Sequence, residues 1–168
     1  MANIVILDGS PRKNGSTAAL EAAFTEGAVG AGNEVVRLYL NGMDIKGCLA
    51  CEACAKNGGQ CVQKDDMEKV NEALMRADVV VFASPQFWGT VSGQLKTAVD
   101  RLYALQNRLG WGNMKKKCAF LMTARGSLYD HALVFYSVFT DFLGWEDLGT
   151  VFGAGRTEEA RKLGASIR

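Results

Sequence analysis

Residues 78–83, Asp-Val-Val-Val-Phe-Ala, are the segment that most restricts the fold of this 168-residue chain. The run is continuously apolar after its first residue, whereas a strand with one face in water alternates apolar and polar side chains. Such a strand must be covered on both faces, which is the situation of inner strands in a parallel sheet between helical layers. The segment therefore predicts an α/β fold.

Other β-rich segments alternate with helical patterns along the whole chain, as a layered α/β fold requires. Apolar residues at helical spacing, such as Leu20, Phe24 and Ala28, mark the helices. The alternation predicts a five-stranded parallel sheet with helices on both faces, in one domain of residues 1–168 with a cysteine-rich insertion at about 47–64. The predicted strands are residues 3–7, 34–40, 78–83, 117–123 and 145–152, and the predicted helices are residues 16–30, 66–76, 91–106, 131–143 and 157–165.

The composition argues against nucleic-acid and membrane partners. Charged residues make up 22% of the chain and the formal net charge is +1, which produces no strong field of either sign. No apolar run approaches the roughly 18 residues of a transmembrane helix, and the N-terminal residues lack the pattern of a signal peptide. We therefore expect a cytoplasmic protein whose cysteines stay reduced.

The first predicted strand ends in Asp-Gly-Ser-Pro-Arg-Lys-Asn-Gly-Ser-Thr, residues 8–17. A helix starting near Ser16 would place unpaired backbone N–H groups and its positive end at this loop. The hydroxyls and Arg12 could add hydrogen bonds to an anion, and the glycines would let it approach the backbone. The pattern predicts a phosphate site that is neither a Walker loop nor G-x-G-x-x-G. The alternative is a helix N-cap formed by Asn14 or Ser16, with Arg12 in solvent.

Two further loops, residues 84–90 and 123–130, follow the third and fourth predicted strands. Ligands of open parallel sheets bind beyond the carboxyl ends of the strands, where the winding direction reverses. Phe87 and Trp88 in the first of these loops could form a wall for a flat ring. They could equally pack at a subunit contact or cap the core.

Three motifs in this order and spacing resemble those of the NAD(P)H-dependent FMN reductases. They are residues 10–17, Asp65-Asp66-Met67, and residues 84–89 followed by Gln94-Leu95-Lys96. The cysteine segment resembles more narrowly the branch that contains the iron–sulfur flavoproteins. The resemblance implies a three-layer flavodoxin-like fold of strand order 2-1-3-4-5, FMN as cofactor, NAD(P)H as co-substrate, and a homodimer or homotetramer with flavin sites near subunit contacts.

The resemblance also implies roles for the residues of the three loops. No catalytic side chain is implied, because FMN itself carries the hydride-transfer chemistry. Arg125 could stabilise reduced flavin or meet the phosphates of the nicotinamide cofactor, or it could simply be solvated, and His131 is expected to be a capping or surface residue. The FMN phosphate would be held by Ser10, Arg12, Asn14, Ser16 and Thr17, and the isoalloxazine ring would lie beside Pro85, Gln86, Phe87, Trp88 and Gly89, with Thr123, Arg125 and Gly126 at its other edge.

Four of the five cysteines, Cys48, Cys51, Cys54 and Cys61, have the spacing C-x₂-C-x₂-C-x₆-C. Such gaps let thiolates converge on one cluster, whereas structural zinc more often uses two separated C-x₂-C pairs. The arrangement is similar to that of the iron–sulfur flavoproteins, which would carry [4Fe–4S]. Cluster-free reductases of this branch can keep several of these cysteines, so free or redox-active thiols remain open. Cys118 is expected to be a small core residue.

These features together predict an FMN-dependent NAD(P)H oxidoreductase that passes electrons to a quinone, a nitroaromatic, a flavin or a protein. One alternative is an electron carrier that uses a [4Fe–4S] cluster and exchanges electrons with a ferredoxin-like protein. The other is a non-enzymatic flavin-binding redox sensor. The helix at residues 131–143 is apolar nearly all round, so it is either fully covered or a subunit contact, and we favour the contact.

Overall fold

The computed structural model describes residues 1–168 and is built on one parallel sheet of five strands in the order β2-β1-β3-β4-β5. The chain winds outward from β1 in both directions, so the winding reverses between β1 and β3. The predicted fold class and strand order are confirmed. The strands are β1 (Asn3–Asp8), β2 (Glu34–Tyr39), β3 (Val79–Pro85), β4 (Lys117–Thr123) and β5 (Glu146–Phe152).

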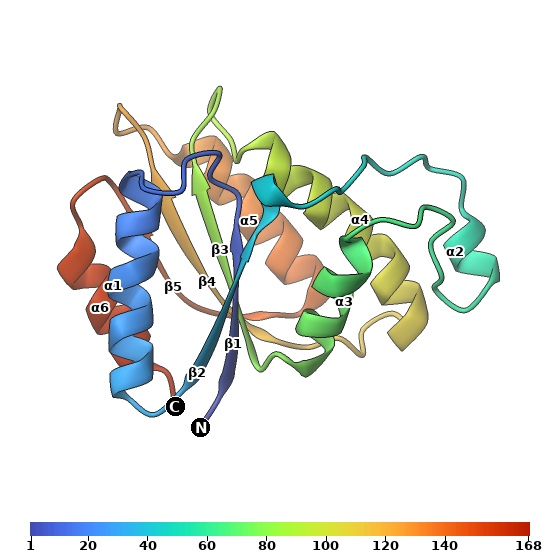
Figure 1. Cartoon of the computed structure of the whole chain (residues 1–168), viewed down its shortest axis with the longest axis horizontal. Coiled ribbons are helices and arrows are strands. Elements are labelled where there is room, and N and C mark those ends of the chain that lie inside the picture. The colour runs from blue at the N-terminus through green and yellow to red at the C-terminus, as the bar shows by residue number, and fades with distance from the viewer.

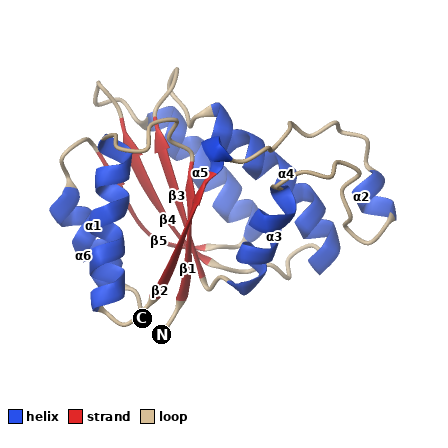
Figure 2. Cartoon of the chain, in the orientation of Figure 1, coloured by secondary structure: helices blue, strands red, loops and turns tan.

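Helices cover both faces of the sheet (Figures 1 and 2). On one face α1 and α6 pack against each other so closely that Gly27 and Gly164 are required: a Cβ on either would lie 2.0–2.1 Å from a backbone oxygen of the other helix. The other three long helices, α3, α4 and α5, cover the opposite face. The helices are α1 (Ser16–Gly30), α2 (Ala53–Lys56), α3 (Met67–Arg76), α4 (Gly93–Leu109), α5 (Asp130–Leu143) and α6 (Thr157–Ser166), with a 3₁₀ turn η1 (Leu40–Gly42).

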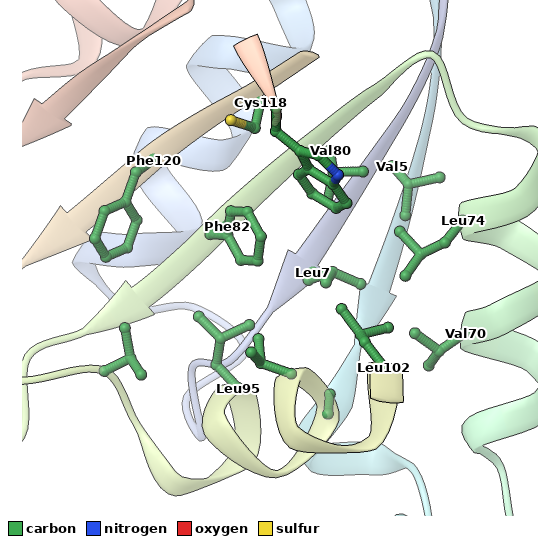
Figure 3. Packing of buried hydrophobic residues seen from close by; sticks show 14 of the residues in the cluster. Val5, Leu7, Val70, Leu74, Val80, Phe82, Leu95, Leu102, Cys118 and Phe120 are labelled. Carbon is green, nitrogen blue, oxygen red and sulfur yellow. The ribbon is translucent and has the colours of Figure 1, made fainter. Parts of the chain in front are cut away.

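Two hydrophobic cores lie on the two faces of the sheet, and β3 contributes to both. Val80 and Phe82 pack into the core beneath α3, α4 and α5, part of which Figure 3 shows. Val79 and Val81 point to the other core, with α1 and α6. All these side chains are buried, as the apolar run predicted, and this inner strand fixes the position of the loop that follows it.

The structure differs from the sequence-based elements in a few places. The helix predicted at 91–106 begins at Gly93, where Ser92 caps it by accepting a hydrogen bond from the Leu95 amide, and it continues to Leu109. The short elements η1 and α2 were not predicted. Helix α5 is not fully covered, because Val134, Val138 and Phe142 are exposed in one stripe along it. None of the helices has both the length and the hydrophobicity needed to cross a membrane.

Candidate functional site

A cavity of about 430 Å³ opens at the carboxyl ends of the strands, between the loops that follow β1, β3, β4 and β5. Every residue predicted to contact flavin lines this cavity except Asn14, which is exposed beside Gly15 and does not reach it. The cavity thus joins segments more than a hundred residues apart. Its lining comprises Ser10, Pro11, Arg12, Gly15, Ser16, Thr17, Pro85, Gln86, Phe87, Trp88, Gly89, Thr123, Ala124, Arg125, Gly126 and Ala154.

The loop between β1 and α1 is tied to its surroundings at successive residues. The Gly9 amide donates to Ala83 O at 2.8 Å, and Ser92 Oγ donates to Gly9 O at 2.7 Å. A Cβ on Gly9 would lie 2.7 Å from both Leu95 Cβ and Ser92 Oγ, so only glycine permits this close approach to α4. Further along, Tyr39 Oη donates to the carbonyl of Pro11 at 3.0 Å. These contacts within the protein hold the loop in its conformation.

Helix α1 begins at this loop without a side-chain cap. Its N-cap residue is Gly15, which has no side chain to accept from the first turn. The alternative that Asn14 or Ser16 caps the helix is therefore wrong. The amides of the first turn and the positive end of the helix dipole remain available to an anion at the cavity. Arg12 and Ser16 are exposed beside them.

The loop after β3 turns sharply within the cavity wall. Phe87 and Thr90 exchange two backbone hydrogen bonds of 2.9 and 3.2 Å, and the two residues between them have positive φ, 50° at Trp88 and 84° at Gly89. Positive φ at both central positions is the type I′ geometry, which an aromatic residue rarely adopts. The Trp88 side chain is completely exposed, and Phe87 is nearly half exposed. Neither ring caps the core.

The loop after β4 closes the opposite side of the cavity. Thr123 is buried, and its hydroxyl lies 2.8 Å from the hydroxyl of Thr17, which joins the end of β4 to the start of α1. Its carbonyl accepts from the Gln86 amide at 2.7 Å. Arg125 and Gly126 are exposed at the rim, and His131 is exposed at the start of α5, a surface position as predicted.

A set of buried charges behind this cavity had not been predicted. Asp8 at the end of β1 and Glu21 on α1 are buried, and Arg37 on β2 forms ion pairs with both at 2.5 Å. The sequence held one signal: Glu21 lies within the apolar stripe that contains Leu20 and Phe24. The pairing itself depends on the sheet register, which places Arg37 beside β1.

The four clustered cysteines surround a second cavity of about 560 Å³, which lies between their segment and α4. Cys48 and Cys51 are exposed, while Cys54 and Cys61 are partly buried. Burial raises the pKa of the Cys54 thiol, and the nearby Cys61 and Cys48 raise it further. The thiols thus share one space, as joint ligation requires, although no three His, Cys, Asp or Glu side chains converge as ligands of a single metal ion.

Arg101 on α4 holds the two ends of the cysteine segment together. Its guanidinium donates to both carboxylate oxygens of Asp65, at 2.7 and 3.0 Å, and to the carbonyl of Lys46 at 2.7 Å. It also donates to Cys61 Sγ at 3.4 Å. Both side chains of the ion pair are almost fully buried. Burial acts to raise the pKa of Asp65, but hydrogen bonds from Arg101 and from the backbone amides of Lys46 and Met67 hold it below its usual value.

The fifth cysteine lies apart from the others. Cys118 is fully buried in β4 within the core beneath α5, as predicted. Burial raises the pKa of its thiol to about 11, and its sulfur lies 3.2 Å from Tyr136 Oη. Cys118 is therefore a neutral packing residue.

The comparisons with known proteins agree with this geometry. A sequence profile of the family described as NADPH-dependent FMN reductase matches residues 2–151. The chain belongs to this family. The match runs from β1 into β5 and includes the loops after β1, β3 and β4, whereas Ala154 and α6 lie beyond it.

Curated relatives of this FMN reductase family member carry the name iron-sulfur flavoprotein. One from Archaeoglobus fulgidus is 35% identical over 113 residues, which cover 63% of this chain and 55% of the relative. One from Methanocaldococcus jannaschii is 39% identical over 99 residues, which cover 59% of this chain and 50% of the relative. The chain spans about half the length of the curated relatives it matches.

Solved structures of a quinone oxidoreductase and an azoreductase share the fold. The NAD(P)H:quinone oxidoreductase from Methanothermobacter marburgensis superposes with a TM-score of 0.79 at 20% identity, covering 99% of both chains. An azoreductase from Bacillus anthracis superposes with a TM-score of 0.73 at 19% identity, covering 99% of this chain and all of the other. At these identities the likeness shows the flavodoxin-like fold.

Proposed function

We propose that the protein is an FMN-dependent NAD(P)H oxidoreductase that passes electrons to a quinone, a nitroaromatic, a free flavin or a protein. The observation that carries this proposal is the single cavity into which the loops after β1, β3 and β4 converge at the point where the winding reverses. The names of the similar proteins, a quinone oxidoreductase and an azoreductase, support the same reaction class.

The phosphate of FMN binds in this proposal at the uncapped start of α1. The backbone amides of the first turn donate to it, and Ser16 and Arg12 add a hydroxyl and a charge-assisted hydrogen bond. Ser10 and Thr17 act mainly by shaping the loop. Ser10 Oγ donates to Arg12 O at 3.1 Å, and the Thr17 hydroxyl pairs with Thr123.

The isoalloxazine ring lies in this proposal between the loop at residues 85–89 and the loop at residues 123–126. The bound FMN supplies the hydride-transfer chemistry. Phe87 and Trp88 provide aromatic surface that excludes water from one side of the ring, and the rigid turn holds them there. Arg125 at the rim supplies positive charge to the polar edge of the ring or to the phosphates of the co-substrate.

The test begins with FMN binding and continues with turnover. The purified protein should bind FMN, quench its fluorescence, and then oxidise NADH or NADPH with menadione or a nitroarene as acceptor. Failure to bind added FMN would contradict the proposal. Binding without turnover for any donor and acceptor pair would favour a flavin-binding sensor instead.

A second candidate function, electron transfer through a [4Fe–4S] cluster, is favoured by the four cysteines around one cavity. Cys48, Cys51, Cys54 and Cys61 would be the ligands, and a ferredoxin-like protein would be the partner. Anaerobic purification followed by iron and sulfide analysis should give about four irons per chain. Flavin without iron would leave a simple FMN reductase with free thiols.

The exposed stripe of Val134, Val138 and Phe142 on α5 supports assembly with a second copy of the chain. We expect a homodimer or homotetramer that buries this stripe. Val138→Asp should then shift the protein toward the monomer in sedimentation velocity. An unchanged sedimentation coefficient would remove α5 from the contact.

A further inference from the structure

Two carboxylates and one guanidinium meet behind the phosphate loop, at the junction of β1, α1 and β2. Asp8 is completely buried and Glu21 is 2% exposed, whereas the Arg37 side chain is 38% exposed. Arg37 contacts Asp8 Oδ2 through Nη2 and Glu21 Oε2 through Nε, each at 2.5 Å. One cation thus serves two buried acids, so the group is neutral only when one of the acids carries a proton.

The hydrogen bonding indicates which acid is protonated. Both side-chain oxygens of Glu21 are buried and neither accepts a hydrogen bond, although Arg37 Nε lies 2.5 Å from Oε2 in an ion pair. Asp8, in contrast, accepts from Arg37 Nη2 and, through Oδ1, from the Ser10 amide at 2.8 Å. A buried carboxylate without donors is costly, whereas a protonated one can donate to its neighbour. A proton on Glu21 would remove this cost and could be donated to Asp8.

The surrounding electrostatics agree with this assignment. Burial, and then the charge of Asp8, raises the pKa of Glu21 to about 8, and Arg37 offsets only part of this. On the neighbouring helix α6, Arg161 pairs with Glu26, which lies more than one turn beyond Glu21 on α1. The sheet surface beneath α1 presents apolar residues of β3 and β4, including Val81, Ala83 and Leu121. No other charge on these elements compensates Glu21.

Asp8 connects this group to the cavity. The amide it accepts from belongs to Ser10, which is 3% exposed and whose hydroxyl bonds both the amide and the carbonyl of Arg12. We propose that Asp8, sharing one proton with Glu21, is the positioning residue of the phosphate loop, and that losing this proton weakens FMN binding. This inference rests on the proposed function, because it concerns the affinity for FMN.

The physical consequence of losing the proton is an uncompensated negative charge behind the loop. Asp8 and Glu21 would then repel each other while competing for Arg37, so the hydrogen bond from the Ser10 amide would lose its fixed acceptor. The extra charge would also repel the phosphate dianion across the buried end of β1. Both effects weaken binding of the phosphate and leave the ring pocket unchanged.

The first test compares FMN and riboflavin affinity at pH 7 and pH 9, after bound flavin has been removed. The FMN phosphate is already a dianion in this range, because its second pKa is about 6. For the wild type, the FMN dissociation constant should rise about fivefold or more between these pH values. Riboflavin, which lacks the phosphate, should show no such rise.

Two variants separate the buried pair from general effects of pH. Glu21→Gln keeps the shape and can still donate to Asp8, so its FMN affinity should stay flat from pH 7 to pH 9. Glu26→Gln is the matched control on the same helix, because Glu26 is exposed and pairs with Arg161. It should retain the wild-type pH dependence. An identical profile for wild type and Glu21→Gln would overturn the role of the shared proton.

Calorimetry supplies a measurement that needs no variant. Binding that favours protonated Glu21 must take up protons near pH 8, so the apparent enthalpy of FMN binding should depend on the ionisation enthalpy of the buffer. FMN binding without proton uptake would overturn the inference and leave the proposed function intact. Absence of FMN binding at every pH would overturn the proposed function, and this role of Asp8 with it.

Discussion

The phosphate loop, residues 9–17, and the cysteine segment, residues 43–66, are built in opposite ways. The loop is short and is tied by hydrogen bonds to β2, β3 and α4. The cysteine segment extends away from the sheet, where Figure 1 shows α2 beyond α3 and α4. Within the segment Gly59 and the side chain of Asp65 are buried, and Arg101 on α4 joins its two ends. One region is therefore held by the fold, and the other depends on few contacts.

The backbone of the two regions shows the same contrast. Ala50 and Glu52, between the cysteines, have positive φ of 51° and 54° although neither is glycine. Such conformations cost about 1–3 kcal/mol each and persist where something else determines them. When successive residues alternate between negative and positive φ, their backbone N–H groups point to one spot. This geometry is common at phosphate and iron–sulfur sites. The difference indicates that contacts with the fold hold the phosphate loop in place, whereas few such contacts hold the cysteine segment.

The largest expected effect concerns the thiols themselves. Cys54→Ala removes a partly buried thiol from the centre of the cysteine segment, so all cluster iron should be lost while FMN stays bound. Anaerobic iron analysis and the visible spectrum measure the two cofactors separately. Cys118→Ala is the control, because Cys118 lies in the core, and it should retain iron. Full iron content in Cys54→Ala would exclude this thiol as a ligand.

The second prediction tests whether Arg101 is the main anchor of the cysteine segment. Arg101→Ala leaves the buried carboxylate of Asp65 unpaired, so the free energy of unfolding should fall by about 3–5 kcal/mol in urea denaturation at pH 7. Arg156→Ala removes an exposed ion pair with Glu159, so it should lower the free energy of unfolding far less. Equal losses for the two variants would contradict the anchoring role.

The pH dependence of the stability of Arg101→Ala tests whether the ionised carboxylate of Asp65 is the partner that stabilises the fold. The pKa of Asp65 is held low in the folded protein, so its pairing stabilises the protein above the unfolded pKa, near 4. That contribution is lost as the pH falls through the lower folded pKa. Below this pH the gap in stability between wild type and Arg101→Ala should therefore narrow. A constant gap down to pH 2 would show that Asp65 is not the partner that matters.

The same contrast separates what the sequence could predict from what it could not. The strands and the long helices followed from apolar periodicity, and the three loops from their residue types and their place after the strands, because each lies in one continuous segment. The ion pairs of Arg37 and Arg101 could not be predicted, since they join residues 16 to 36 positions apart. Asn14 was expected at the cavity because of its position in the motif, but it points to solvent where the chain extends into Gly15.

The third prediction concerns the phosphate loop. Arg12→Ala removes one charge-assisted hydrogen bond to the phosphate and should weaken FMN binding about 10- to 150-fold, measured by fluorescence quenching. The loop itself should survive, because its anchors do not involve the Arg12 side chain. Lys13→Ala is the matched control: Lys13 is the neighbouring cation but lies outside the cavity lining, over the Tyr39 ring. An unchanged affinity for Arg12→Ala would remove Arg12 from the site.

The smallest expected effect tests whether the turn at Trp88 is held for its ligand. Trp88→Gly relieves the strain of a non-glycine residue at positive φ and removes a side chain that packs on nothing. The melting temperature should therefore rise by about 2–4 °C. Trp88→Ala also removes the ring but keeps the strained backbone, so it should show no such rise. Both variants should bind FMN more weakly, because both lose the aromatic wall of the ring pocket. A gain in stability without a loss of affinity would make Trp88 a strained surface residue with no part in the flavin site.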